Sequence, residues 1–176
     1  MKSMLELVSI ILILQRLSEL VLARRNEKRA FNRGGIEYGA RHYPVIVLLH
    51  VLWFIGFIVE NRAKGMGHVE WDVSVIFIWP LWAGMFVSAQ VLRYWAIASL
   101  GDAWNTRIII VPGRSLVRKG PYRFMPHPNY VAVIMEFIAV PMLVGAPITA
   151  IVGTTLNLAL LLFVRIPAEN KALQKL

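Results

Sequence analysis

The sequence predicts an all-α integral membrane protein with about five transmembrane helices and a tight helical hairpin near the C-terminal end. Two observations support this fold class. First, 57% of the 176 residues are hydrophobic and the mean hydropathy is +0.59, whereas soluble domains are about 45–50% apolar with glycine included. Second, the lysines and arginines stand between long apolar runs, as they do around transmembrane helices.

A helix that crosses a bilayer needs about 20 mostly apolar residues, and the segments that qualify are 3–23, 43–60, 73–99, 129–144 and 147–165. The first is expected to be a retained helix and not a signal peptide, because polar residues interrupt it and no small-residue cleavage site follows. Only Gly145 and Ala146 join the fourth to the fifth, which predicts a tight antiparallel hairpin. Pro80 should kink the third helix, and Pro141 should bend or end the short fourth one.

The distribution of basic residues predicts the orientation. Lys and Arg gather in residues 24–41, in residues 107–123 and in the tail 171–175, whereas residues 61–72 contain only Arg62 and Lys64. An odd number of spans with the N-terminus outside places the three basic regions and the C-terminus in the cytoplasm. We therefore expect one membrane-embedded domain, residues 1–176, in which 1–99 form the first three helices and 100–176 form a binding loop, the hairpin and a cytoplasmic tail.

The composition excludes several classes of function. The net charge of +9 does not indicate a nucleic-acid partner, because the basic residues follow the predicted membrane topology and not one polar domain. There is no cysteine for a disulfide, a thiolate nucleophile or a metal ligand. The histidines, at positions 42, 50, 68 and 127, form no pair four residues apart, so no metal site is expected. No Gly-x-Ser-x-Gly motif suggests a serine hydrolase.

Residues 111–136 are the most informative stretch of the chain. They combine basic residues, two glycines and four prolines with a histidine and two tyrosines, and then enter an apolar helix. Pro128 suits the first position of that helix and His127 its cap. The first turn, with its backbone N–H groups and the positive end of the helix dipole, is then a site for an anion such as a carboxylate. His127 and Tyr130 share one face of the helix, and Asn129 and Glu136 share another.

Ionisable residues within predicted spans are costly and usually face a partner or a cavity. Arg16 and Glu19 are three residues apart, so we interpret them as an ion pair. His50 is interpreted as a packed histidine with a backbone partner. For Arg93 two interpretations stay equally open: its side chain extends to the cytoplasmic headgroups, or it belongs to a site.

Glu136 lies two turns inside the fourth helix, with no basic residue four positions away. We interpret it as a ligand of a bound polar molecule; the alternative is that Arg93 or Arg165 of a neighbouring helix neutralises it. Arg165 and Glu169 share a face at the end of the fifth helix, provided that Pro167 does not break the helix between them.

Two linked motifs resemble a known family. The run G-P-Y-R-x-x-x-H-P-N-Y at 120–130, followed by Glu136 and by R-x-x-x-E-x-x-x-L at 165–173, resembles the isoprenylcysteine carboxyl methyltransferase and phospholipid methyltransferase superfamily. The run W-x-T-R-I-I-x-x-P-G at 104–113 is similar to a bacterial branch often associated with type III polyketide synthases. The resemblance covers the C-terminal half, from Trp104 onward, and implies an integral membrane enzyme, here of the bacterial cytoplasmic membrane with its active site facing the cytoplasm.

The resemblance implies S-adenosylmethionine as cofactor and a lipophilic acceptor, an alkylpyrone or alkylresorcinol hydroxyl. It assigns cofactor binding to the matching positions Tyr122, His127, Pro128, Tyr130 and Glu169. We add Glu136 to this set. We expect Arg165 and Glu169 to be catalytic, and Trp104 and Arg107 to bind the substrate. The sequence departs from the family pattern at two positions. Pro126 stands where many relatives have Arg, which argues against an arginine at this position that binds a substrate carboxylate. Asn170 stands where the tail usually has a second Glu, which argues against binding by two carboxylates.

Several alternatives stay open at this stage. The acceptor could be a prenylcysteine carboxylate, which the loss of Arg at position 126 argues against, or a phospholipid amine. A small transporter is a second class, but transporters commonly show repeats in both halves, whereas this chain concentrates its motifs in one. A membrane scaffold whose basic loops bind anionic lipids or a partner, such as a polyketide synthase, is a third. A purely structural re-entrant turn would explain the prolines, but not the His, Tyr and Glu together.

Overall fold

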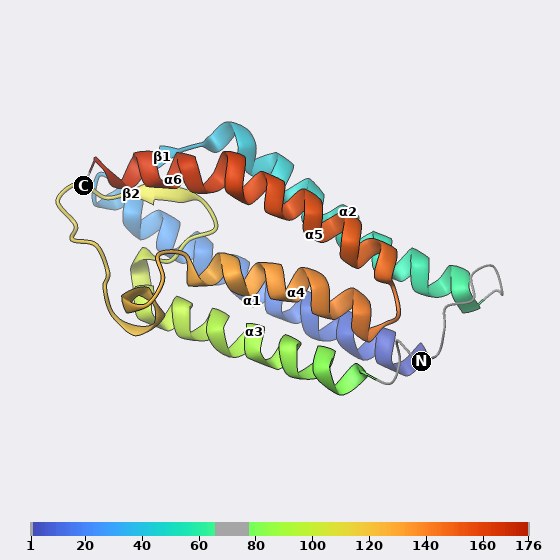
Figure 1. Ribbon diagram of the computed structural model, residues 1–176. Coiled ribbons are helices and arrows are strands. Elements are labelled where there is room, and N and C mark those ends of the chain that lie inside the picture. Colours follow the sequence, from blue (N-terminus) through green and yellow to red (C-terminus); the bar gives the residue numbers. More distant parts are fainter. Residues whose placement is uncertain (1, 66–77, 176) are drawn as a thin grey trace.

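The computed structural model describes residues 2–65 and 78–175, and in these the long helices lie side by side along one axis (Figure 1). These helices are α1 (Lys2–Asn32), α2 (Tyr43–Gly65), α3 (Trp79–Leu100), α4 (Pro128–Leu143) and α5 (Pro147–Leu160). The C-terminal residues and the 111–127 segment lie at one end of the molecule, and the beginning of α1 and the α4–α5 turn lie at the other (Figure 1). This arrangement places the sequence motifs of the C-terminal half at a single end.

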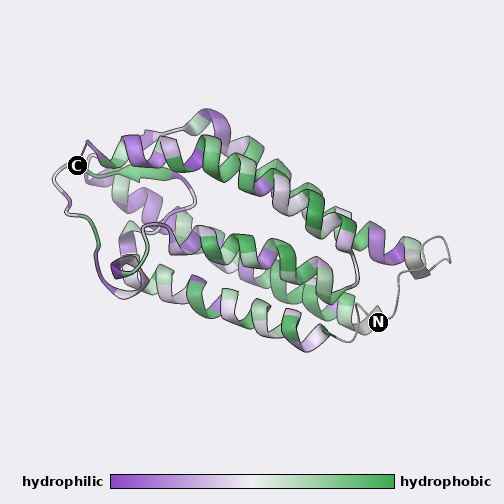
Figure 2. Cartoon of the chain, in the orientation of Figure 1, coloured by the Kyte–Doolittle hydropathy of each residue, from purple (hydrophilic) through white to green (hydrophobic). Residues whose placement is uncertain are grey.

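Two stretches of the described residues are long and apolar enough to cross a membrane: Ala40–Ala63, and Pro147–Leu173, which runs from α5 into the tail. Within the second stretch Phe163 is 79% exposed, and outside both stretches Leu14 and Val21 of α1 and Val91 of α3 are exposed as well. Soluble monomers rarely expose apolar surface on this scale. Figure 2 shows hydrophilic residues gathered at the end that carries the C-terminus. The number of spans and the orientation stay predictions.

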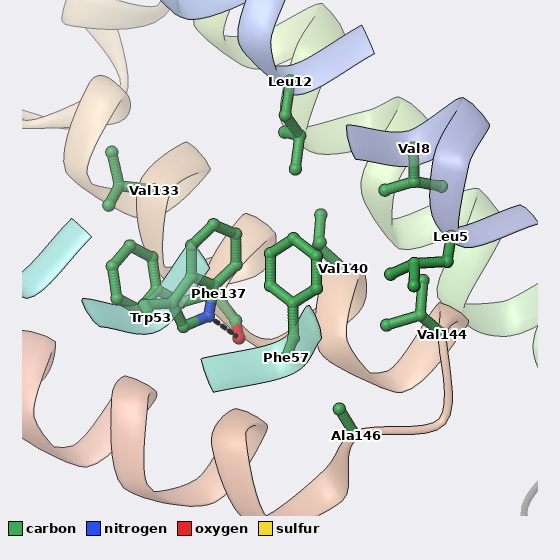
Figure 3. Packing of buried hydrophobic residues seen from close by; sticks show 10 residues of the cluster. All are labelled: Leu5, Val8, Leu12, Trp53, Phe57, Val133, Phe137, Val140, Val144 and Ala146. Carbon is green, nitrogen blue, oxygen red and sulfur yellow. Dashed lines mark hydrogen bonds between the residues drawn. The ribbon is translucent and has the colours of Figure 1, made fainter. Parts of the chain in front are cut away.

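An aromatic cluster holds α2 against α4. The rings of Trp53 and Phe137 stack with centroids 4.5 Å apart, and Trp53 Nε1 donates to the Phe137 carbonyl at 3.2 Å (Figure 3). Phe57 packs edge-on against Trp53 and is fully buried. On the other side of Trp53, α5 approaches so closely that a Cβ on Gly153 would lie 2.6 Å from Trp53 Cδ1, which explains why glycine occupies that position.

The predicted hairpin between α4 and α5 is confirmed. Helix α4 ends two residues after Pro141, Gly145 turns the chain with φ of 71°, and α5 begins at Pro147. Glu60 at the end of α2 caps α5: its carboxylate accepts hydrogen bonds from the backbone N–H groups of Ile148 at 3.0 Å and Thr149 at 2.8 Å. This carboxylate satisfies donors that the start of a helix leaves free.

The third helix differs from its prediction. Residues 73–77 of the predicted span lie outside the described residues, and α3 begins at Trp79 with Pro80 in its first turn. Proline is well tolerated there, because the first turn needs no N–H donor. Pro80 therefore begins the helix, and the expected kink within it is wrong.

A two-stranded antiparallel sheet, which the all-α prediction did not include, pairs β1 (Ile36–Tyr38) with β2 (Ile108–Ile110). Short 3₁₀ turns flank it: η1 (Ala40–His42), η3 (Gly101–Ala103) and η4 (Gly120–Arg123). The tail helix α6 (Ile166–Leu173) packs Ala172 against Ile108 and Ile110. The sheet thus holds the tail helix α6 next to the start of α4.

A π-helical turn, η5 (Leu161–Arg165), joins α5 to α6 without a break. Its marker is the backbone N–H of Ile166, which donates to the carbonyl of Leu161, five residues back. Pro167 has no N–H to donate to residue 163 and its ring would collide with that carbonyl in a regular helix, so a wider turn relieves the conflict. Pro167 therefore widens the helix and does not end it.

Candidate active site

One cavity of about 760 Å³ runs from the end of the molecule with the C-terminus into the bundle. Its walls come from α1 and α2, from the 100–118 segment, from the start of α4, and from α5 with the tail helix. Its size falls within the range of about 300–1,000 Å³ that is usual for small-molecule sites. The residues around it form two polar groups at different depths, separated by apolar walls.

The outer group brings together the residues that the sequence predicted as catalytic. Tyr130 donates a short hydrogen bond to Glu169 and accepts one from Arg165 Nε at 3.0 Å. Arg165 Nη2 also donates to the carbonyl of Thr106 at 2.9 Å, which ties the tail to the 104–107 segment. Arg165 and Glu169 thus share a face, as the sequence predicted, and Tyr130 stands between them.

His127 is the cap of α4, as predicted, and adds an aromatic surface to the outer group. Its ring stacks on Tyr130 with centroids 5.2 Å apart, and its Nε2 lies 3.2 Å from Asn170 Oδ1. An amide oxygen only accepts, so Nε2 is the protonated nitrogen in this contact. Nδ1 lies 3.9 Å from Glu169. Asn170 therefore serves as the partner of His127.

The remaining predicted cofactor residues take different positions. Pro128 is buried at the first position of α4 and shapes the helix start without lining the cavity. Tyr122 lines the cavity, and burial together with the nearby charge of Glu169 raises the pKa of its phenol. Asn129 also lines it, and its buried Oδ1 has no hydrogen-bond partner among residues 2–65 and 78–175.

Trp104 and Arg107, predicted to bind substrate, both line the cavity. Trp104 is buried, at 3% exposure. Arg107 Nη1 pairs with Glu37 at 3.1 Å, and its guanidinium lies 5.0 Å from the ring centre of Tyr43. Burial opposes the charge of Arg107, but Glu37 and Glu27 outweigh it and raise its pKa. Arg107 is therefore held at the cavity wall by its own ion pairs.

Glu136 does not join the outer group. It is fully buried, does not line the cavity, and accepts hydrogen bonds from Arg93 and from Arg16 Nη2, the latter at 2.9 Å. The structure therefore supports the alternative in which an arginine of a neighbouring helix neutralises Glu136, and gives no support to direct cofactor binding. Two interpretations of Arg93 were equally open, and because it is 1% exposed, the one in which its side chain extends to the headgroups is wrong.

The inner group is an ion cluster, defined here as Arg16, Glu19, Arg93 and Glu136. The predicted pair Arg16–Glu19 is confirmed at 2.7 Å, and Arg93 approaches Glu19 at 3.4 Å. Two positive and two negative charges from α1, α3 and α4 thus balance. His50 lies nearby with its Nδ1 2.8 Å from the Ile46 carbonyl, the backbone partner predicted for it.

Sequence reasoning noted Asn129 and Asn170 without giving either a site role, and it missed Thr106 and the joining of Arg16 with Glu136. The signals for Asn129 and Asn170 were their places in the sequence, next to Pro128 and next to Glu169. The others depend on which helices are neighbours, which no local pattern encodes. Among the described residues, no group of three or more His, Asp or Glu could hold a metal ion; His68 lies outside them.

Comparison with known proteins gives consistent matches. The model of the isoprenylcysteine carboxyl methyltransferase (ICMT) family matches residues 82–175. The uncharacterized protein YpbQ of Bacillus subtilis (strain 168) is 44% identical over 165 residues, which are 94% of each chain. An uncharacterized protein of Haemophilus influenzae is 26% identical over 162 residues, 92% of this chain and 90% of that one. No solved structure matches the chain.

Proposed function

The chain belongs to the isoprenylcysteine carboxyl methyltransferase family, whose members are membrane-embedded methyltransferases, and from that premise we propose that it methylates an oxygen of a lipophilic small molecule, with S-adenosylmethionine as the methyl donor. The observation that carries the proposal is one cavity with two kinds of wall. Its outer end is polar and open to the aqueous side that we expect to be the cytoplasm, and its sides are apolar.

The outer group fits the polar parts of S-adenosylmethionine. Arg165 offers a cation for the methionyl carboxylate, next to the positive end of the α4 dipole. Glu169 offers an acceptor for the ammonium, and Asn129 Oδ1, which has no partner in the described part of the chain, offers one for the ribose hydroxyls. The His127 and Tyr122 rings offer flat surfaces for a base. Tyr130 holds Arg165 and Glu169 at a fixed separation, so this site is organised before the cofactor binds.

When bound beside Arg165 and Glu169, S-adenosylmethionine would supply the methyl group: the acceptor oxygen would form the new C–O bond, the S–CH₃ bond would break with its electron pair passing to sulfur, and the hydroxyl proton would leave. The protein has two tasks in this transfer. It holds the acceptor oxygen in line, at about 3–3.5 Å from the carbon. It also excludes water, which helps because opposite charges neutralise each other as the methyl group moves. Glu169 is the carboxylate of the outer group that is placed to receive the proton, and Arg165 and Arg107 favour an acceptor anion.

The apolar walls favour an acceptor that stays in the lipid. Leu17 of α1 and Val47 and Val51 of α2 line the cavity and are about half exposed. Apolar, accessible side chains on both helices support entry of a hydrocarbon tail between α1 and α2. Each CH₂ that stays in lipid saves about 0.8 kcal/mol. We infer an alkylpyrone or alkylresorcinol as the acceptor, and a polyketide synthase as the source that would deliver it.

The proposal is tested by the binding of S-adenosylhomocysteine to the protein in lipid nanodiscs, measured by calorimetry. We expect the wild type to bind and the folded His127→Ala variant to lose at least tenfold in affinity, because Ala removes a ring that stacks on Tyr130. His42→Ala serves as a control, since His42 does not line the cavity. Alkylpyrones, alkylresorcinols, prenylcysteines and phospholipid amines are then compared as acceptors. Absence of binding to the wild type in detergent and in lipid would favour a scaffold or transporter.

A further inference from the structure

The inner part of the cavity has a polar wall that the proposed cofactor site does not use. Along α4, Tyr130 of the outer group and Glu136 of the ion cluster are six residues apart, about 9 Å at 1.5 Å per residue. Arg16 and Glu19 of the cluster line the cavity at this inner depth. Two further polar residues line it as well: His50 of α2 and Asn157 of α5.

His50 and Asn157 lie at the same depth. Trp53 of α2 contacts Gly153 of α5, and the two helices are antiparallel neighbours (Figure 1). His50 is one turn before Trp53 and Asn157 is one turn after Gly153, so both lie one turn closer to the outer group than that contact. His50 also meets Phe137 edge-on at 4.9 Å, and Phe137 follows Glu136, which binds Arg16. The ion cluster and this pair therefore share one level.

The two side chains offer one acceptor and one donor. Nδ1 of His50 lies 2.8 Å from a backbone carbonyl, which only accepts, so Nδ1 carries the proton and Nε2 of the neutral ring is an acceptor. Asn157 is 2% exposed, and its Nδ2 donor has no partner in the described part of the chain. A buried donor without a partner is destabilising, and a bound ligand that accepts from it removes that cost.

We propose that His50 and Asn157 form a subsite for a second, non-reacting hydroxyl of the acceptor ring, which donates to His50 Nε2 and accepts from Asn157 Nδ2. A hydroxyl is the small group that both donates and accepts at one atom; a carbonyl would satisfy Asn157 alone. The ion cluster beside it is charge-balanced, so the subsite suits a neutral head and gives no attraction to a carboxylate or phosphate. The substrate class is therefore a dihydroxy ring with an alkyl tail, and the inference rests on the proposed function.

The test measures acceptor binding without cofactor, by calorimetry in nanodiscs, for a long-chain 5-alkylresorcinol and the 3-alkylphenol of equal chain length. We expect the wild type to bind the resorcinol about tenfold more tightly. Asn157→Leu should remove this preference without lowering the melting temperature, because it deletes a buried Nδ2 donor that has no partner among the described residues. Thr154→Val is the matched control: Thr154 has a buried hydroxyl on the same helix, also without a partner among the described residues, but it does not line the cavity, so the preference should persist.

Equal binding of the two probes to the wild type would overturn the subsite, as would a preference that survives in Asn157→Leu. If Asn157→Leu does not fold, Asn157→Val and the wild-type preference decide the question. S-adenosylhomocysteine binding, measured in parallel, separates the two proposals. A protein that binds S-adenosylhomocysteine but does not distinguish the probes is a methyltransferase without this subsite, whereas one that binds no S-adenosylhomocysteine fails the proposed function.

Discussion

The two halves of the chain build different walls of the same cavity. The family match begins at residue 82, within α3, and this half carries the outer group: His127, Tyr130, Arg165 and Glu169. The other half, α1 and α2, lies before the match, yet it supplies His50, Arg16 and apolar residues of the cavity wall. The difference suggests a division of labour, in which the matched half alone holds the cofactor, whereas α1 and α2, together with Asn157 of α5, choose the acceptor.

The halves are joined by polar contacts at three depths. Near the C-terminal end, the Asp102 carboxylate accepts hydrogen bonds from Arg33 Nη1 of α1 and from Arg114 Nη2, each at 2.5 Å. At mid-depth the ion cluster joins α1 to α3 and α4. At the far end Glu60 of α2 caps α5. The ion cluster is the most buried of these contacts, and Glu60 and Asp102 are only partly buried. We therefore expect the loss in free energy of unfolding to be largest when the ion cluster is broken, smaller at Glu60 and smallest at Asp102.

The largest effect is expected at the ion cluster. Arg93→Met leaves Glu136 and Glu19 sharing only Arg16, so a buried negative charge remains uncompensated. Breaking a buried pair from one side typically costs about 3–5 kcal/mol, and we expect that loss in the free energy of unfolding, measured by denaturant titration in mixed micelles. Arg62→Met, on an exposed position of α2, is the control, with a change under about 0.5 kcal/mol.

A loss at Arg93 as small as that at Arg62 would mean that the halves are not held together at mid-depth. Glu136→Leu combined with Arg93→Met gives a second readout, because replacing both partners of a buried pair by apolar side chains of similar volume is often close to neutral. The double variant should therefore recover most of the stability that Arg93→Met loses.

Local signals in the sequence predicted part of this arrangement. The start of α4 at Pro128, its cap at His127, the turn at Gly145 and the common face of Arg165 and Glu169 all depend on residues within a few positions of one another. The partner of Glu136, the β1–β2 pairing and the level shared by His50 and Asn157 depend on which helices are neighbours. Sequence spacing limits such contacts but does not select them, which is why Glu136 was assigned to the cofactor.

The division of labour predicts a second effect, on binding and not on folding. Glu169→Gln keeps the shape of the side chain but removes the charge that Tyr130 donates to. Hydrogen bonds to charged groups are worth about 1.5–3 kcal/mol, so S-adenosylhomocysteine should bind about ten- to a hundredfold more weakly, while 5-alkylresorcinol binding stays within about twofold. Glu60→Gln, a carboxylate outside the cavity, should change neither affinity. Equal losses for both ligands would contradict separate cofactor and acceptor walls.

A smaller effect is expected at the far end, where Glu60→Ala removes the cap of α5. Its carboxylate satisfies two backbone N–H groups and the Thr149 hydroxyl, and losing a helix cap costs about 0.5–2 kcal/mol. We expect a fall of that size in the free energy of unfolding, with unchanged ligand affinities. Glu6→Ala, an exposed glutamate on α1, is the control. An unchanged stability would mean that lipid or water replaces Glu60 at this helix start.

The smallest effect is expected at Asp102, and its signature is its dependence on pH. Hydrogen bonds from Arg114 and Arg33 lower the pKa of Asp102 to about 2 in the folded protein, below the usual value of about 3.9 for an unfolded chain. A lowered folded-state pKa stabilises the protein above about pH 4, and this contribution disappears as the pH falls towards 2. The contact is partly exposed, so its worth is under about 1 kcal/mol. Asp102→Asn should therefore lower the melting temperature slightly at pH 6, and the gap to the wild type should narrow as the pH falls from about 4 towards 2. A gap of the same size at pH 6 and at pH 2 would show that the Asp102 side chain acts through packing and not through its charge, and that the joint between the halves at this end is not electrostatic.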